Sequence, residues 1–324
     1  ILVDEAHHSV STQYKSIFAK WPNAKRIGVT ATPARPDGKG LDEVFSDIVI
    51  GPSMRWLIDE EFLAEYDYYA PPSDVDFSKV RMDKAGEYNE KDAEEAISAS
   101  RTIVGDAVRH YKQLMPGKPA MVFCTGTQHA KDVAAEFNAA GIPSAAIDGT
   151  MPSSEQDALM DDLAEGRILC LMSADLIGEG VDVPCVVGCI MLRKTASVVI
   201  FLQQAGRALR LKPDGGKAII LDHVGNCQSH GYPADHREWT LEGAPKKNKV
   251  CTKTCNRCSR SFHAHEAKRV ATDECGDVEC PIKNGSETAA ERREIEVIDA
   301  DLVAMNNPYA WAEGIDIALA KGAE

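Results

Sequence analysis

The sequence lacks the features that mark membrane-spanning and exported proteins. It contains no run of about 18 or more apolar residues, which a helix needs to cross a bilayer, and no basic segment followed by an apolar one stands at its start. It also lacks an excess of positive charge, because its formal net charge is −14. That charge argues against a broad basic binding surface, although a few local cations and loop amides can still line a groove. We therefore expect a cytoplasmic protein with no membrane partner.

The composition argues against a disordered chain, since 44% of the 324 residues are apolar and 27% are charged. A chain of this length predicts two or three domains with substantial cores. The first residue is Ile1 rather than Met, and the chain opens inside an apolar run. We expect the sequence to be a fragment whose start is missing.

The ten cysteines fall into two groups. Five are scattered through apolar surroundings, where buried free thiols are the usual state. They are Cys124, Cys170, Cys185, Cys189 and Cys227. The other five lie between Cys251 and Cys280, which is a metal-binding pattern in a reducing compartment. The alternative is a disulfide knot in a secreted protein.

Two adjacent carboxylates, Asp4 and Glu5, follow the apolar residues at the start of the chain. A strand that is buried on both faces places its first polar residues at the edge of a parallel sheet, where α/β proteins bind ligands. There Asp4 would hold Mg²⁺ through water, and Glu5 would orient or deprotonate an attacking water. The alternative is that the two acids only cap a helix.

Several further stretches occur downstream in a fixed order. After Asp4-Glu5-Ala6-His7 come the run from Arg26 to Arg35, which continues to Gly40, the run from Gly178 to Pro184, the run from Gln203 to Arg210 and the run from Leu221 to Asn226. The first four resemble motifs II, III, V and VI of superfamily 2 helicases, and the resemblance covers residues 1–226. In detail the sequence is similar to the RadD branch of bacterial DNA repair helicases, near the restriction-enzyme helicase subunits.

The resemblance implies that ATP and Mg²⁺ bind between two RecA-like lobes. It places Asp4, Glu5 and His7 in the catalytic set, with Asp4 as the magnesium ligand. It gives Thr30 and Thr32 a role in coupling the nucleotide to the strand-binding state. The alternative for the two threonines is that their hydroxyls only satisfy backbone groups at the end of a strand.

The resemblance also assigns residues of the second lobe to the nucleotide. Arg207 and Arg210 would act in catalysis, since they lie three apart on a helical face and could both neutralise charge on the transferred phosphoryl group. The alternative is a solvated basic stripe. The remaining residues expected to contact the nucleotide are Gln203, Gly178, Gly180 and Asp182.

No phosphate-binding loop of the form Gly-x-x-x-x-Gly-Lys-Ser/Thr occurs in the sequence. The run from Asp37 to Gly40 lacks both the leading glycine and the hydroxyl that would bind magnesium. In the helicases this loop precedes the acidic strand, so we expect it ahead of Ile1. The chain alone is then expected to be inactive.

The second cysteine group predicts a zinc site. Cys255 and Cys258 are separated by two residues, and Cys275 and Cys280 by four, so the two pairs could hold one tetrahedral Zn²⁺. Because the second pair is looser than usual, Cys251, His263 and His265 are possible substitutes, and RadD-like proteins carry a zinc-binding region in this position. Basic residues between Lys246 and Arg269 favour contact with a phosphate backbone, although such linkers are often only solvated.

Strands that alternate with helices predict an α/β fold, with RecA-like parallel-sheet lobes followed by a small zinc module. The expected order is a truncated first lobe (1–70), an interlobe connection (71–100), a second lobe with motifs IV, V and VI (101–226), a polar linker (227–250), a zinc-ribbon-like module (251–282) and a tail (283–324). A strand at the end of the first lobe is expected at 66–69, and the strands of the second lobe are expected at 119–124, 145–148, 168–172, 185–192 and 217–221. Its helices are expected at 102–115, 128–140, 153–164 and 198–209.

Together these features predict an ATP-dependent DNA helicase or translocase, active on single-stranded or branched DNA. One alternative is an RNA helicase, because Asp-Glu-Ala-His also occurs in those enzymes. The other is a zinc-dependent nucleic-acid-binding fragment without catalysis, which the missing phosphate loop would permit.

Overall fold

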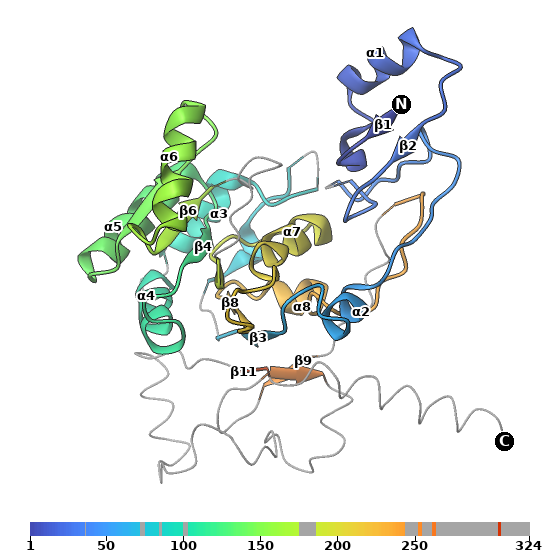
Figure 1. Cartoon of the computed structure of the whole chain (residues 1–324). Coiled ribbons are helices and arrows are strands. Elements are labelled where there is room, and N and C mark those ends of the chain that lie inside the picture. The colour runs from blue at the N-terminus through green and yellow to red at the C-terminus, as the bar shows by residue number, and fades with distance from the viewer. Residues whose placement is uncertain are drawn as a thin grey trace, which may run out of the picture.

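The computed structural model describes residues 1–35, 37–71, 75–83, 86–99, 103–174, 186–243, 252–254, 261–263 and 304–305. Within this part of the chain, a small N-terminal unit (residues 1–45) sits beside a larger α/β body (residues 54–243), here called the main body (Figure 1). An extended segment, residues 46–53, joins the two.

The N-terminal unit is built on two short parallel strands, β1 (Leu2–Val3) and β2 (Ile27–Gly28). Between them lie the 3₁₀ turn η1 (Ala6–His8) and helix α1 (Thr12–Lys20). Val3, Ala6 and Phe18 form its small core. Leu2 and Ile27 pair in register but are 71% and 63% exposed, so one apolar face of this sheet is open.

The sheet of the main body, completed by β11 from later in the chain, has seven strands in the order β11-β3-β8-β7-β4-β6-β5. Its strands are β3 (Tyr66–Tyr69), β4 (Ala120–Phe123), β5 (Ser144–Ile147), β6 (Cys170–Ser173), β7 (Gly188–Met191), β8 (Ala218–Asp222) and β11 (Ala304–Met305). All pairings are parallel except that of β11 with β3. The predicted parallel α/β sheet is therefore confirmed.

Helices pack around this sheet (Figure 1). They are α2 (Met54–Asp59), η2 (Phe77–Lys79), α3 (Glu90–Ala99), α4 (Ile103–Leu114), α5 (Thr127–Ala139), α6 (Ser153–Ala164), α7 (Val198–Ala208) and α8 (Asn226–His230). Central strands such as β4, β6 and β7 are buried along their whole length, which explains their unbroken apolar sequences. Burying each large apolar side chain contributes about 1.5–3 kcal/mol. None of the described helices has the length and apolar character needed to cross a membrane.

The boundary expected at residue 70 differs from the structure. Strand β3 pairs in parallel with β8 of the main body, and Ile58 of α2 lies in the same core, so both elements belong to the main body. The chain crosses between the two units at residues 46–53 rather than at 71–100. Periodicity identifies a strand but does not say which sheet it joins, and here the correct strand bounds were assigned to the wrong lobe.

The expected interlobe connection also contains structure of its own. Helix α3 buries Ala93 and Ile97, and Ile97 lies in the core of the main body. Its apolar residues are few and its charges many, so its sequence looked like a linker. Beyond the main body, β9 (Thr252–Thr254) and β10 (Ser261–His263) form an antiparallel pair.

Candidate nucleotide-binding site

The two acidic residues lie where strand β1 ends. Asp4 is exposed, and its Oδ1 accepts a hydrogen bond of 2.9 Å from the Glu5 backbone N–H. Glu5 has φ 47° and ψ 53°, a left-handed conformation that a residue with a side chain adopts only when its surroundings impose it. The resulting turn leads into η1, and Glu5 Oε2 lies 3.4 Å from His7 Nδ1.

His7 joins the acidic turn to the second expected segment. The imidazole is buried, and its Nδ1 lies 3.1 Å from Thr30 Oγ1. The Thr30 hydroxyl in turn donates to the Thr32 carbonyl and accepts from the Thr32 N–H, both at 3.2 Å. The structure thus brings Glu5, His7, Thr30 and Thr32 together from two segments more than 20 residues apart.

This arrangement fits a magnesium nucleotide. Mg²⁺ at such sites usually keeps several waters and takes one or two protein carboxylates, and the exposed Asp4 is of this kind. Among the residues that the structure describes, no group of three or more His, Cys, Asp and Glu side chains could hold a metal by itself. Within the described part of the chain the buried Thr32 hydroxyl has no hydrogen-bond partner, so it is available to a group that enters the site.

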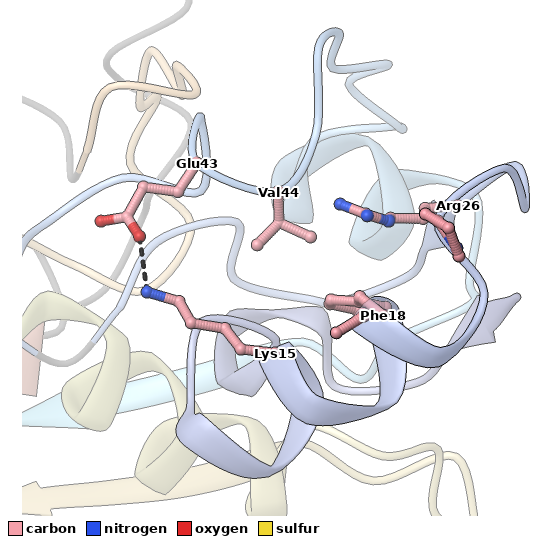
Figure 2. A pocket seen from close by; sticks show the side chains of 7 residues that line it. Lys15, Phe18, Arg26, Glu43 and Val44 are labelled. Atoms are coloured by element: carbon pink, nitrogen blue, oxygen red, sulfur yellow. Dashed lines mark hydrogen bonds and ion pairs between the residues drawn. The ribbon is translucent and has the colours of Figure 1, made fainter.

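A pocket of about 340 Å³ also lies in the N-terminal unit, but none of the expected site residues lines it. Figure 2 shows Lys15 of α1 paired with Glu43 at 2.8 Å and Phe18 beneath Arg26, whose guanidinium carbon lies 4.5 Å from the ring centroid. Its charged residues already have partners, so we assign it no role in the site.

The expected arginines lie at the end of helix α7. Arg207 is in its last turn, but the helix ends at Ala208, so Arg210 lies beyond it. The ammonium group of Lys212 donates to the carbonyls of Ala208 and Arg210 and so terminates the helix. The argument from helical spacing therefore does not place both guanidinium groups on one face, and their shared role stays a prediction.

The glutamine pair of the same helix is divided between surface and interior. Gln203, the expected nucleotide contact, is half-buried, whereas Gln204 is only 1% exposed. Neither polar atom of the Gln204 side chain has a hydrogen-bond partner in the described residues. Burying an amide without a hydrogen-bond partner destabilises the folded state, so a partner that reaches Gln204 would be stabilising.

A polar cluster at the carboxyl end of β7 was missed from the sequence. Glu87 accepts hydrogen bonds from the Thr195 hydroxyl and, at 2.8 Å, from the Ala196 N–H. Lys194 donates to the carbonyls of Val224 and Gly225, each at 2.8 Å, and its burial lowers its pKa. No short motif signals this cluster, because its members come from three separate segments.

Several predicted residues lie outside the described residues. They are Gly178, Gly180 and Asp182 of the expected motif V loop, and Cys251, Cys255, Cys258, Cys275, Cys280 and His265 of the expected zinc module. Of His263 the structure describes the backbone, which belongs to β10 and pairs with Thr252.

Comparison with known families adds two matches. Residues 104–212 match the helicase conserved C-terminal domain, and residues 1–35 match the res subunit of type III restriction enzymes. The first match covers α4 to α7, and the second covers the cluster from Glu5 to Thr32.

Individual proteins are similar over longer stretches. A 51.5 kDa protein of a Lactococcus phage (isolate 7-9) is 38% identical over 265 residues, which are 80% of this chain and 58% of that protein. The DNA 3'-5' helicase XPB of Mycobacterium tuberculosis is 26% identical over 242 residues, 74% of this chain and 42% of that protein. A fragment of an HsdR subunit of a type I restriction enzyme from Vibrio vulnificus YJ016 shares the fold, with a TM-score of 0.57 at 22% identity, over 76% of this chain and 46% of that one. The chain thus spans about half the length of these relatives.

Proposed function

We propose that the chain is part of an ATP-dependent DNA helicase or translocase of superfamily 2, which its matches to the helicase C-terminal domain and to the res subunit of type III restriction enzymes support. The observation that carries the proposal is the joined cluster of Glu5, His7, Thr30 and Thr32, which links a candidate water-activating carboxylate to the segment expected to sense the nucleotide. The N-terminal unit is part of the first RecA-like lobe, and the main body is the second lobe.

Further strands of the first lobe would cover the open face of the β1–β2 sheet, where Leu2 and Ile27 are exposed. A phosphate-binding loop would come with them and hold the β- and γ-phosphates. Mg²⁺ would be bound through Asp4, and ATP with this ion supplies the phosphoryl group that is transferred to water.

Each residue of the candidate site would then have a separate role in ATP hydrolysis. Glu5 positions the attacking water and takes up its proton, while His7 holds the Glu5 carboxylate in place. Thr30 and Thr32 pass changes at the nucleotide to the loop that follows them. Arg207 and Arg210 neutralise charge on the transferred phosphoryl group when the lobes close.

DNA is the proposed substrate because the similar XPB protein is named as a DNA helicase. A single strand of DNA would cross the sheet edge where the parallel β-strands end, because α/β proteins bind ligands there. The region around 251–280 would bind zinc, and its basic residues would contact the phosphate backbone of the DNA.

The fold at the start of this region fits a zinc module. β9 and β10 pair with Thr254 opposite Ser261, and the residues between them in sequence, 255–260, include Cys255 and Cys258. A pair of cysteines separated by two residues is typical of zinc-binding sequences. A small segment with few apolar residues also gains much of its folding free energy from a metal.

The test of the proposed function is Glu5→Gln in a full-length protein that contains a phosphate-binding loop. The substitution removes the charge that positions water but leaves Asp4 for the metal, so ATP should still bind while kcat falls by about 10²–10⁴-fold. Glu43→Gln is the matched control, since Glu43 is an exposed carboxylate of the same unit paired with Lys15. ATP hydrolysis with and without single-stranded DNA is the measurement. Undiminished turnover in Glu5→Gln would remove Glu5 from the site.

A further inference from the structure

The last residues of the main body return to the N-terminal unit. Residues 239–243, here called the strap, run beside the loop that follows Thr32 (Figure 1). The Leu41 N–H donates a hydrogen bond of 2.7 Å to the Leu241 carbonyl, and Lys39 and Gly243 form an antiparallel bridge. Leu41 is buried at this contact although the crossing segment 46–53 is largely exposed.

The contact depends on two glycines, one on each side. A Cβ atom on Gly40 would lie 1.9 Å from the Leu241 carbonyl oxygen and 2.5 Å from the Glu242 carbonyl carbon. Gly243 has φ +152°, and a Cβ there would lie 2.6 Å from the Gly38 carbonyl oxygen. The obstacles are backbone atoms, which cannot rotate away as a side chain can, so any side chain at either position forces the two segments apart.

The strap is firmly held by the main body. The Arg237 guanidinium donates to four carbonyls, those of His230, Tyr232, Pro233 and Asp235, at 2.8–3.0 Å. Trp239 packs against the core of the main body. The strap is therefore fixed to the main body where it begins.

The other side of the contact leads back to the candidate nucleotide site. The Ala34 N–H donates to the Thr32 carbonyl at 2.8 Å, and the Arg35 N–H donates to the Lys39 carbonyl at 3.1 Å. Asp37 holds this loop by pairing with Arg35 at 2.7 Å and by accepting from the Lys39 N–H at 3.2 Å. A continuous series of hydrogen bonds thus runs from His7 through Thr30 and Thr32 to the loop that the strap holds.

We propose that the strap is a mechanical link between the lobes, which ties the loop of residues 32–41 to the main body so that lobe closure and the position of Thr30 and Thr32 change together. Gly40 and Gly243 are positioning residues in this link. The part of the proposal that concerns ATP turnover rests on the proposed helicase function. The part that concerns the contact and the spacing of the lobes does not.

The test compares Gly40→Ala, Gly243→Ala and the double variant with Gly149→Ala in the full-length protein. Gly149 is the matched control, because it is exposed in the main body and a Cβ there would meet no atom within 4 Å. The first measurement is hydrogen exchange at the Leu41 amide. This amide should be protected in the wild type and the control, and should exchange faster in Gly40→Ala and in Gly243→Ala. A wild-type Leu41 amide that exchanges at the rate of an unprotected one would overturn the proposal.

The second measurement is the distance between the lobes. Non-natural residues at the exposed positions Gln13 of α1 and Glu136 of α5 carry the labels, so that native thiols play no part. Gly40→Ala should broaden the distance distribution, and the double variant should broaden it no further because both changes break one contact. A distribution identical to that of the control overturns the link, and a thermal melt shows that each variant is folded.

The third measurement is DNA-stimulated ATP hydrolysis. Gly40→Ala should lower kcat by at least about 5-fold, the lower end of what coupling between two sites amounts to, and leave the KM for ATP unchanged. An active wild type whose Gly40→Ala variant matches the control overturns the coupling. A wild type without hydrolysis, but with a protected Leu41 amide and a distribution that broadens in Gly40→Ala, supports the link and counts against the proposed function alone.

Discussion

Tyr68→Phe is expected to weaken the main body at a point where a single hydroxyl serves a buried carboxylate. Asp222, at the carboxyl end of β8, is completely buried, and its oxygens accept from the Tyr68 hydroxyl at 2.8 Å, the Cys227 N–H at 2.8 Å and the Val224 N–H at 3.3 Å. These bonds join β3, β8 and the start of α8. Burial and the neighbouring Asp222 raise the pKa of Tyr68 well above its usual value, so the phenol stays protonated and donates.

The magnitude follows from what the substitution removes. The ring of Tyr68 is 1% exposed and stays in place in the phenylalanine variant, so apolar burial is nearly unchanged. The loss is one hydrogen bond to a charged group, which is worth about 1.5–3 kcal/mol. The equilibrium constant for opening of the main sheet should therefore rise by about 10–150-fold.

The assay is native-state hydrogen exchange of the β8 amides, for example Ile219, whose N–H donates to the Val187 carbonyl at 3.0 Å. These amides report the opening of the main sheet and are not affected by separate unfolding of the N-terminal unit. Their protection should fall by the same 10–150-fold, taken from about 1.5–3 kcal/mol. Tyr88→Phe is the control, because its half-buried hydroxyl makes no hydrogen bond in the described residues. A loss below about twofold, or an equal loss in the control, would refute the reasoning.

Three further predictions concern catalysis, pH and metal. Arg207→Ala in the full-length protein should lower kcat for ATP by about 10³–10⁵-fold without a change in folding stability; a stability loss with normal turnover would indicate a structural residue instead. Burial lowers the pKa of His129 from 6.5 to about 4, although Asp132 opposes the shift. The folded state therefore disfavours the protonated form, so the stability is complete above about pH 6.5 and declines as the pH falls towards 4, by at most about 3 kcal/mol. Urea unfolding at pH 7.5, 5.5 and 4.5 should show that the free energy of unfolding falls less with decreasing pH in His129→Gln than in the wild type. An equal fall in both proteins would exclude His129 as the cause. Cys258→Ser should abolish the binding of about one Zn²⁺ per chain in elemental analysis and leave the sheet of the main body intact; a wild type without zinc would leave the cysteine cluster without this role.

Local patterns determined the elements of the main body. The helix predicted at 153–164 and the strand at Tyr66–Tyr69 have those bounds in the structure, and the other predicted helices and strands of the second lobe differ mainly at their ends. Apolar spacing decides such elements because it acts between neighbours in the chain. The same holds for each motif taken by itself, since Asp4, Glu5 and His7 are near neighbours in the chain, as are Thr30 and Thr32, whereas the contact between these two segments is tertiary.

The tertiary structure alone decided which elements belong together. Whether β3 joined the first or the second sheet depended on its pairing with β8, about 150 residues away, which leaves no local signal. The bond between Tyr68 and Asp222, the left-handed turn at Glu5 and the approach of Gly40 to Leu241 are of the same kind. A hydrogen bond or a close backbone contact between distant segments is fixed by how whole elements pack, because the free energy of each contact appears only after the chain between its ends has been ordered.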